Sequence, residues 1–230
     1  MAKRMRGAIP SPRHKLAAAK PHVIVGATPP YCLYNPTELS TWGNTQYGDC
    51  VTAEEAFAKA CHAGEIFLPD SVVIGWAQTH NVLSSAVISD VLETMVSDGF
   101  TQNGSVYDDG QSSAVDWTNA PILQNAIAQG PVKLGVAANQ LDSLNTTQSG
   151  WFATGFTSDS IEDHCVSLCG FGPLSWLAGQ LSVQLPDGVN GDAPGYAMFT
   201  WGTIGIIDEP SMQAITHEAW LRSPTTVVTP

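Results

Sequence analysis

A turn that ends in a cysteine, Asn44-Thr45-Gln46-Tyr47-Gly48-Asp49-Cys50, leads directly into Val51-Thr52-Ala53-Glu54-Glu55-Ala56-Phe57-Ala58-Lys59-Ala60. Residues 51–63 are rich in Ala, Glu and Lys, which favour a helix. Asp49 is a candidate N-cap for this helix, and Gly64 is a candidate stop. Cys50 is therefore predicted to lie in the first helical turn, where unpaired amide groups and the positive end of the helix dipole favour a thiolate.

A histidine begins an apolar strand in a second segment, Asp163-His164-Cys165-Val166-Ser167-Leu168-Cys169-Gly170-Phe171-Gly172. A thiolate that attacks a carbonyl needs an imidazole beside it, so Cys50 and His164 are candidate catalytic residues. Asn44 is a third candidate, because its side-chain amide and the backbone N–H of Cys50 would form an oxyanion hole. Taken singly, the cysteine is more often a small buried hydrophobe and the histidine a structural residue at a strand end.

The chain resembles the papain-like cysteine peptidases over residues 27–222. Five segments carry the resemblance, in the order of that family: Asn44 to Phe57, with its Gly48-x-Cys50; Gly130-Pro131-Val132; Ser149-Gly150-Trp151-Phe152; Asp163-His164 with the strand that follows; and Thr200-Trp201-Gly202. The resemblance implies a cleft with the cysteine on its helical side and the histidine on its sheet side. It also implies that Trp201 shields the histidine.

The chain departs from the family at the oxyanion residue. The family has a glutamine where this sequence has Asn44, whose side chain is one methylene shorter. Gln46 lies close by and would serve only if the loop differed from that of the family.

A second departure concerns the group that orients the histidine. The family's asparagine falls on Phe199, and a phenylalanine cannot accept a hydrogen bond from the imidazole. Thr200 is adjacent, but strand alternation turns it away from the face of Trp201 unless a bulge intervenes. We therefore expect a backbone carbonyl, a water or a residue of the 185–195 loop, with Asn190 and Asp192 as candidates, to hold the ring.

The charge of the chain is divided unevenly. Six of the nine Lys and Arg residues lie in residues 1–20, which contain no acid, so the remainder carries 21 acidic and three basic residues. Residues 1–20 are predicted to form a basic, flexible N-terminal tail, with contacts to the acidic body, to nucleic acid or to another anionic surface as alternatives. We expect the tail to be separable from the fold.

The element pattern predicts one α+β catalytic domain over residues 21–230. Its helical half spans about 21–130, with expected helices at 51–63, 70–80, 84–97 and 120–129 and a surface loop at 101–118. Its β half spans about 131–230, with expected strands at 131–138, 151–156, 164–171, 178–184, 196–201 and 218–222. The predicted fold is papain-like: an N-terminal helical subdomain with a central helix, packed on a C-terminal antiparallel β-sheet or barrel subdomain.

The cysteines favour a reducing compartment. Their number is odd, the resembled family's disulfide positions around the nucleophile are absent, and the tail lacks an apolar run of signal-peptide length. Reduced thiols in the cytoplasm are expected. A metal site at His164, Cys165 and Cys169 is disfavoured, because the two thiols would lie about 13 Å apart along a strand of ~3.3 Å per residue.

These observations predict a papain-like thiol hydrolase that cleaves peptide or isopeptide-like amide bonds through Cys50 and His164, with Asn44 at the oxyanion. A peptide or protein is the expected partner, without a cofactor, a metal or a membrane, and nucleic acid is disfavoured because only the tail is basic. Two alternatives stay open: an acyl transferase on the same scaffold, and a catalytically degenerate binding or structural protein, which Phe199 would favour.

Overall fold

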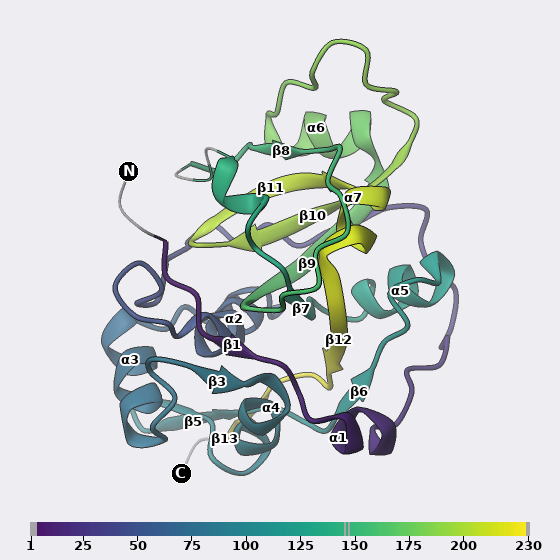
Figure 1. The fold of residues 1–230 in the computed structure, drawn as a ribbon. Helices are drawn as coiled ribbons and strands as arrows, with labels where there is room; N and C mark the ends of the chain where they lie inside the picture. Colours follow the sequence, from purple (N-terminus) through teal and green to yellow (C-terminus); the bar gives the residue numbers. More distant parts are fainter. Residues whose placement is uncertain (1–3, 145, 147, 229–230) are drawn as a thin grey trace.

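The computed structural model describes residues 4–144, 146 and 148–228. Residues 1–3 of the expected tail and 229–230 of the expected β half lie outside the described residues. The described helices are α1 (Arg13–Ala18), α2 (Cys50–Ala60), α3 (Asp70–Thr79), α4 (Ile88–Ser97), α5 (Ala120–Ile127), α6 (Leu174–Leu181) and α7 (Glu209–Ile215), with a 3₁₀ turn, η1, at Leu141–Ser143. Figure 1 shows α2–α4 gathered at one end of the molecule and α6 at the other.

A sheet of eight strands forms the other half of the architecture. Its order is β6 (Ser112–Ala114), β12 (Thr216–Arg222), β7 (Val132–Val136), β9 (His164–Pro173), β10 (Pro194–Thr200), β11 (Thr203–Asp208) and β8 (Phe152–Ala153), and β2 (Cys32–Leu33) also pairs with β9. All of these pairs are antiparallel except that of β8 with β11. The α+β, papain-like arrangement predicted from the sequence is confirmed.

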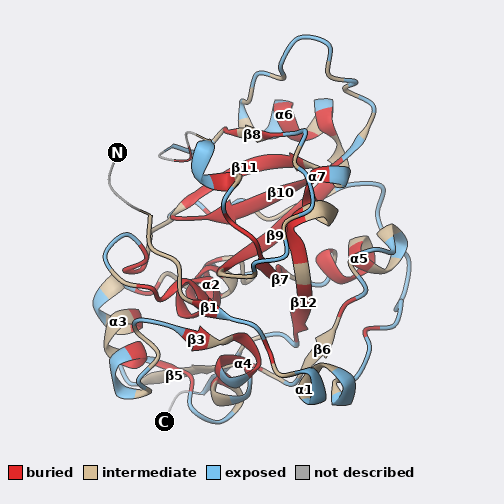
Figure 2. Cartoon of the chain, viewed as in Figure 1, coloured by how far each residue is buried: buried red, intermediate tan, exposed pale blue. Residues whose placement is uncertain are grey.

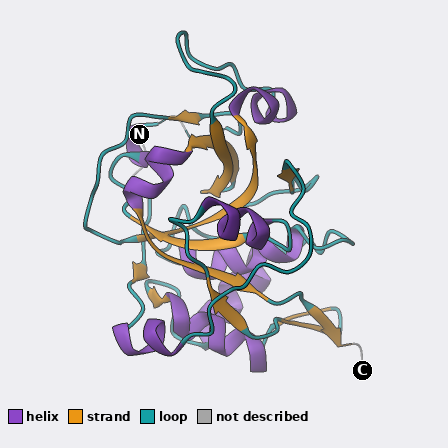
Figure 3. Cartoon of the chain, turned by 90° about the vertical axis from the view of Figure 1, so that its right-hand side faces the viewer, coloured by secondary structure: helices purple, strands orange, loops and turns teal. Residues whose placement is uncertain are grey.

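The central strands are buried on both faces because successive side chains point to opposite sides. On β10, Ala197 and Phe199 pack with the α2 side of the sheet, whereas Tyr196 and Met198 pack on the opposite side with residues of α5 and α7. Figure 2 shows the long strands and much of α2 as buried, and Figure 3 shows helices on both sides of the curved strands.

The helical half holds a second, smaller sheet that the sequence did not predict. Its order is β13 (Thr226–Val228), β5 (Ser105–Asp108) and β4 (Phe100–Gln102). The segment 101–118, expected to be a loop, therefore contributes β4, β5 and β6. The C-terminal β13 returns to the helical half. The two halves are therefore not two consecutive stretches of sequence, which differs from the expected division near residue 130.

Residues 178–184, expected to be a strand, fall largely in α6, and β11 and α7 were not predicted. The α6 error arises because Leu174, Leu177, Ala178 and Leu181 all pack on the core at helical spacing, a pattern that a short apolar run hides. The expected helix at 84–97 begins only at Ile88. The two residues before it form β3 (Ala86–Val87) instead.

The N-terminal segment does not project into solvent. Residues 8–9 form β1 (Ala8–Ile9), which pairs in parallel with β3. Farther along, the Ser11 N–H donates to Glu218 Oε1 at 2.8 Å, and Lys15 forms ion pairs with Asp90 and Glu93. The expectation of a free arm therefore differs from the structure, in which the described part of the segment lies on its own acidic body. The purple trace of Figure 1 follows this path between the helical half and the sheet.

Candidate active site

Cys50 is the first residue of α2, and its side chain is fully buried. The backbone carbonyl of Asp49 accepts the first helical hydrogen bonds from Thr52 and Ala53, at 2.9 Å each. The Asp49 side chain does not cap the helix, contrary to expectation, and it is buried as well. Burial, reinforced by the nearby charge of Asp70, raises the pKa of the Asp49 carboxyl to about 8.

His164 is the first residue of β9 and is also fully buried. Its Nε2 lies 2.8 Å from the Thr200 hydroxyl, and its ring stacks on Trp201 with centroids 4.3 Å apart. Among the described residues, its Nδ1 has no hydrogen-bond partner. One ring nitrogen is therefore held, while the other is available to a further group.

Thr200 is the residue that orients the imidazole, so the expected carbonyl, water or 185–195 loop residue was wrong. Asn190 accepts from the Asp192 backbone N–H at an exposed site instead. Phe199 points into the core, where it stacks on Phe57 at 4.0 Å. A bulge between Ala197 and Met198 shifts the register of β10 against β9.

Trp201 reaches the histidine because it lies in a turn and no longer follows the alternation of β10. It and Gly202 connect Thr200 to Thr203, and both have positive φ, 45° and 80°. Two such residues between paired antiparallel strands are typical of a tight hairpin turn, and glycine accepts this conformation without steric cost. The turn places the indole over His164, in agreement with the shielding role that the family resemblance implied.

Cys50 and the start of β9 lie against each other. The backbone N–H of Cys165, the residue that follows His164, is directed at the Cys50 sulfur. Cys50 therefore contacts the residue that directly follows His164. Cys165 and Cys169 pack in the core beside α2, as expected from their spacing, and the five cysteines are free thiols.

The described part of the N-terminal segment covers this site. The Gly7 N–H is also directed at the Cys50 sulfur, and Gly7 carbonyl oxygen accepts from the Ala86 N–H at 2.8 Å. On one side of Gly7, the Trp201 Nε1–H donates to the Met5 carbonyl at 3.0 Å. On the other side, the Ala8 N–H donates to the Asp163 carbonyl at 3.2 Å.

The cover changes the titration of both candidate residues. Burial raises the pKa of the Cys50 thiol to about 12, although the two directed N–H groups oppose that rise. Burial, followed by the positive charges of Arg6 and Arg4, lowers the pKa of His164 to about 3. The thiolate expected from the helix start is therefore not favoured in this closed state, because desolvation outweighs the helix dipole.

Asn44 is buried in the turn before α2, and within the described chain its Oδ1 has no hydrogen-bond partner. Gln46 is exposed. The burial of Asn44 and the exposure of Gln46 favour the register of the sequence comparison, in which Asn44 takes the oxyanion position. Its role in stabilising an oxyanion stays a prediction.

No family model matches this sequence, and no curated protein matches it significantly. Solved structures do match. Xylellain, a cysteine protease from Xylella fastidiosa, has a TM-score of 0.65 at 13% identity, over 97% of this chain and 98% of xylellain. The Amb a 11 cysteine protease of ragweed pollen, in its proform, has a TM-score of 0.63 at 12% identity, over 92% and 74% of the two chains.

The protein has the papain-like cysteine protease fold. A third match, digestive procathepsin L 3 from the larval midgut of Tenebrio molitor, has a TM-score of 0.63 at 12% identity and covers 89% of this chain and 73% of that one. At these identities the likeness concerns the fold. Whether this papain-like chain has the chemistry of its structural neighbours depends on its own residues.

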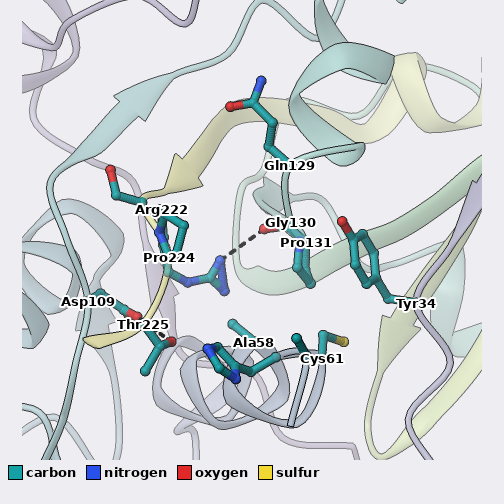
Figure 4. A pocket seen from close by; sticks show the side chains of 13 residues that line it. Tyr34, Ala58, Cys61, Asp109, Gln129, Gly130, Pro131, Arg222, Pro224 and Thr225 are labelled. Carbon is teal, nitrogen blue, oxygen red and sulfur yellow. Dashed lines mark hydrogen bonds between the residues drawn. The ribbon is translucent and has the colours of Figure 1, made fainter. Parts of the chain in front are cut away.

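A separate pocket of about 260 Å³ opens beyond the far end of α2, lined by Cys61, Asp109, Arg222 and their neighbours (Figure 4). The Arg222 guanidinium donates to the Pro131 carbonyl at 3.2 Å and is also bonded to Glu55. This pocket contains none of the predicted site residues. No helix in the described ranges is long and apolar enough to cross a membrane.

The sequence did not identify the contacts that Arg4, Arg6, Gly7 and Thr200 make at this site. The signal for the first three was the contrast between the basic segment and the acidic body, which favoured contact between them. Thr200 could not be separated from its competitors, because strand alternation does not extend into the turn at Trp201.

Proposed function

We propose that this protein is a thiol hydrolase that cleaves peptide or isopeptide-like amide bonds, with Cys50 as nucleophile and His164 as its acid–base partner. The observation that carries the proposal is the state of His164. Its Nε2 is held by Thr200, its ring is stacked on Trp201, and its Nδ1 lacks a partner among the described residues. A thiol at a helix N-terminus lies against the same strand start.

The reaction would proceed through a thioester. His164 takes the proton of Cys50, and the sulfur attacks the carbonyl carbon of the amide. The Cys50 N–H and the Asn44 amide would stabilise the oxyanion. His164 then gives the proton to the leaving amine as the C–N bond breaks, and water cleaves the thioester to release the acid and restore the thiol.

The N-terminal segment would hold this enzyme closed. It presents an amide N–H, not a carbonyl, to the Cys50 sulfur, and the Gly7 carbonyl is already bonded to Ala86. The segment therefore blocks the nucleophile without offering it an electrophile. When the segment leaves, both the burial and the charges of Arg4 and Arg6 are removed, so the pKa of Cys50 falls and that of His164 rises towards an ion pair.

The test uses an open variant, the full chain with Arg4→Ala, Arg6→Ala and Gly7→Val. Iodoacetamide should alkylate Cys50 at pH 7 much faster in the open variant than in the native chain, and the variant should hydrolyse a mixed peptide library. The same variant with Cys50→Ala is the matched control and should be inert. An open variant that is folded by circular dichroism and alkylates rapidly, yet cleaves no amide, would contradict the proposed hydrolase.

A further inference from the structure

The two arginines of the N-terminal segment, Arg4 and Arg6, make more side-chain contacts to the body than are needed to cover the cleft. Arg6 forms ion pairs with both Asp142 and Asp163, and its Nη1 also donates to Asn139 Oδ1 at 2.9 Å. A planar guanidinium can bond two carboxylates at once, which a lysine ammonium cannot match in geometry. These partners belong to the body of the protein and come from the β7–β9 region.

Arg4 occupies a neighbouring position with different chemistry. Its guanidinium donates to the carbonyls of Leu141 at 3.1 Å and Leu144 at 3.0 Å, with a longer contact to the Asp142 carbonyl at 3.4 Å. These oxygens lie in and directly after the 3₁₀ turn η1. The Leu141 and Leu144 carbonyls also accept from the backbone N–H groups of Leu144 and Thr146, at 3.1 and 3.0 Å, so the guanidinium uses their second lone pairs. The guanidinium carbon also lies 4.8 Å from the centroid of the Trp201 ring, a cation–π contact.

The groups that hold Arg6 are themselves positioned by the body. Asp163 Oδ1 accepts from the Ala138 N–H at 3.1 Å, which leaves its other oxygen for the guanidinium. Asn139 Nδ2 donates to Asp159 at 2.8 Å, which turns its carbonyl oxygen towards Arg6. None of these supporting bonds involves the N-terminal segment, so a preorganised acceptor set would persist when the segment leaves.

The residue after Arg6 is restricted as well. A Cβ on Gly7 would lie 1.7 Å from the Gly48 carbonyl oxygen, and Gly48 is itself closed in by the carbonyls of Ser84 and Arg6. Backbone on both sides cannot yield as a flexible side chain would. The surface therefore fits a glycine, and no larger residue, directly after the second arginine.

We propose that Asn139, Asp142, Asp163 and the carbonyls of residues 141, 142 and 144 form a recognition site for peptides of the pattern Arg-Xaa-Arg-Gly. In the closed protein this arginine site binds residues 4–7 of the same chain, and in the open protein it binds the same sequence in another polypeptide. The inference rests on the proposed function only in taking the Cys50 cleft as a peptide-binding site. The net acidity of the body attracts such basic ligands.

The test is the protection of Cys50 in the open variant, which requires no turnover. The blocked peptide Arg-Met-Arg-Gly-Ala-Ile should slow iodoacetamide labelling at a concentration at least about tenfold lower than the matched peptide Ala-Met-Ala-Gly-Ala-Ile, because each lost charge-assisted hydrogen bond weakens binding by that order. A lysine version and a version with valine for glycine should both protect less well. Salt should weaken the protection, because the contacts lie near the surface.

Asp142→Asn in the open variant should reduce the advantage of the arginine peptide, measured against the labelling rate of the same variant without peptide, because Arg6 loses one of its two carboxylates. Equal protection by the arginine and alanine peptides would overturn the inference, as would an advantage that is undiminished in Asp142→Asn. Its failure is distinct from that of the proposed function. Hydrolysis without selective protection rejects the arginine site alone, and selective protection without hydrolysis rejects the hydrolase alone.

Discussion

Two adjacent residues of α2, Glu54 and Glu55, are both fully buried but in opposite surroundings. Glu55 is bonded to Lys133 and Arg222, and these cations hold the pKa of its carboxyl below the usual range despite burial. Glu54 faces Ser167, and in the described chain neither of its oxygens has a hydrogen-bond partner. Burial raises its pKa well above the ordinary value, which favours the protonated, neutral form of Glu54.

The difference extends along the helix. Towards the C-terminal end, Lys59 pairs with Asp109, so this end buries charges that compensate one another. At the N-terminal end, the buried carboxyl oxygens of Asp49 have no hydrogen-bond partner among the described residues, and the cleft beside Cys50 is closed by residues 4–9. Paired charges maintain the fold, whereas the unpaired groups collect around the candidate chemistry, as functional sites commonly do.

The largest effect should come from breaking the paired end. Glu55→Gln leaves two buried cations without their anion, and we expect the free energy of unfolding to fall by about 3–5 kcal/mol. Glu54→Gln is the matched control one residue away. It replaces a carboxyl whose neutral form burial favours by an amide of similar shape, and it should change stability by less than about 1 kcal/mol. Urea unfolding of both variants measures the contrast. Equal losses would show that the two carboxyls are not in different states.

The oxyanion position should give the next largest effect, now at the unpaired end. In the open variant, Asn44→Ala should lower kcat by ~10²-fold or more, because a preorganised donor to the developing oxyanion is lost. The rate of Cys50 alkylation should stay nearly unchanged, since alkylation forms no oxyanion. Gln46→Ala is the control and should have little effect, given that Gln46 is exposed. The reverse result would move the oxyanion role to Gln46.

Replacing Thr200 should lower both activity and stability, the latter by a moderate amount. Thr200→Val removes the group that bonds His164 Nε2 and should lower the free energy of unfolding by about 1–3 kcal/mol, the cost of leaving a buried donor unpaired. The kcat of the open variant should fall as well, because the ring loses its orientation. Thr200→Ser keeps the hydroxyl and should recover most of both losses. If valine and serine behave alike, the hydroxyl does not orient the histidine.

The sequence was sufficient for the parts of the site in which local and family patterns coincide. Cys50 at a helix start, His164 at a strand start and the overall α+β fold followed from helix formers, turn residues and motif order. The orienting residue did not, because its identity depends on the pairing of β10 with β9 and on the two positive-φ residues that turn Trp201 back over the ring. Neither feature leaves a periodic signal in the sequence.

The closure of the cleft by the N-terminal segment was even harder to predict from the sequence. Composition separated a basic segment from an acidic body, but it could not tell a solvated arm from a docked one. The docking depends on tertiary contacts between residues more than 130 positions apart, such as Arg6 with Asp142 and Asp163. It also depends on the close approach of Gly7 to Gly48. For the same reason the high thiol pKa of Cys50 could not be anticipated from its place on the helix.

The smallest expected effect concerns Glu162 and Glu218, a carboxyl pair beside Gly135 on β7 that forms no ion pair with a described residue. Burial, together with the hydrogen bond and charge of Glu218, raises the pKa of Glu162 from 4.5 to about 9. The native state therefore keeps a proton that the unfolded chain releases between these pH values, so Glu162 makes stability fall as pH rises through that window. Asp49, whose pKa is also raised, acts in the same direction.

Glu162→Gln removes the titrating group and should flatten, without abolishing, the decline of the thermal midpoint between about pH 5 and pH 9. Glu38→Gln, at an exposed position, should leave the decline as it is in the native chain. Circular dichroism melts of the three proteins across this range give the comparison. Glu218 also accepts the Ser11 N–H, so the charge repulsion between Glu162 and Glu218 acts next to an anchor of the N-terminal segment. A decline as steep in Glu162→Gln as in the native chain would mean that Glu162 does not keep its proton in the folded protein across this pH range.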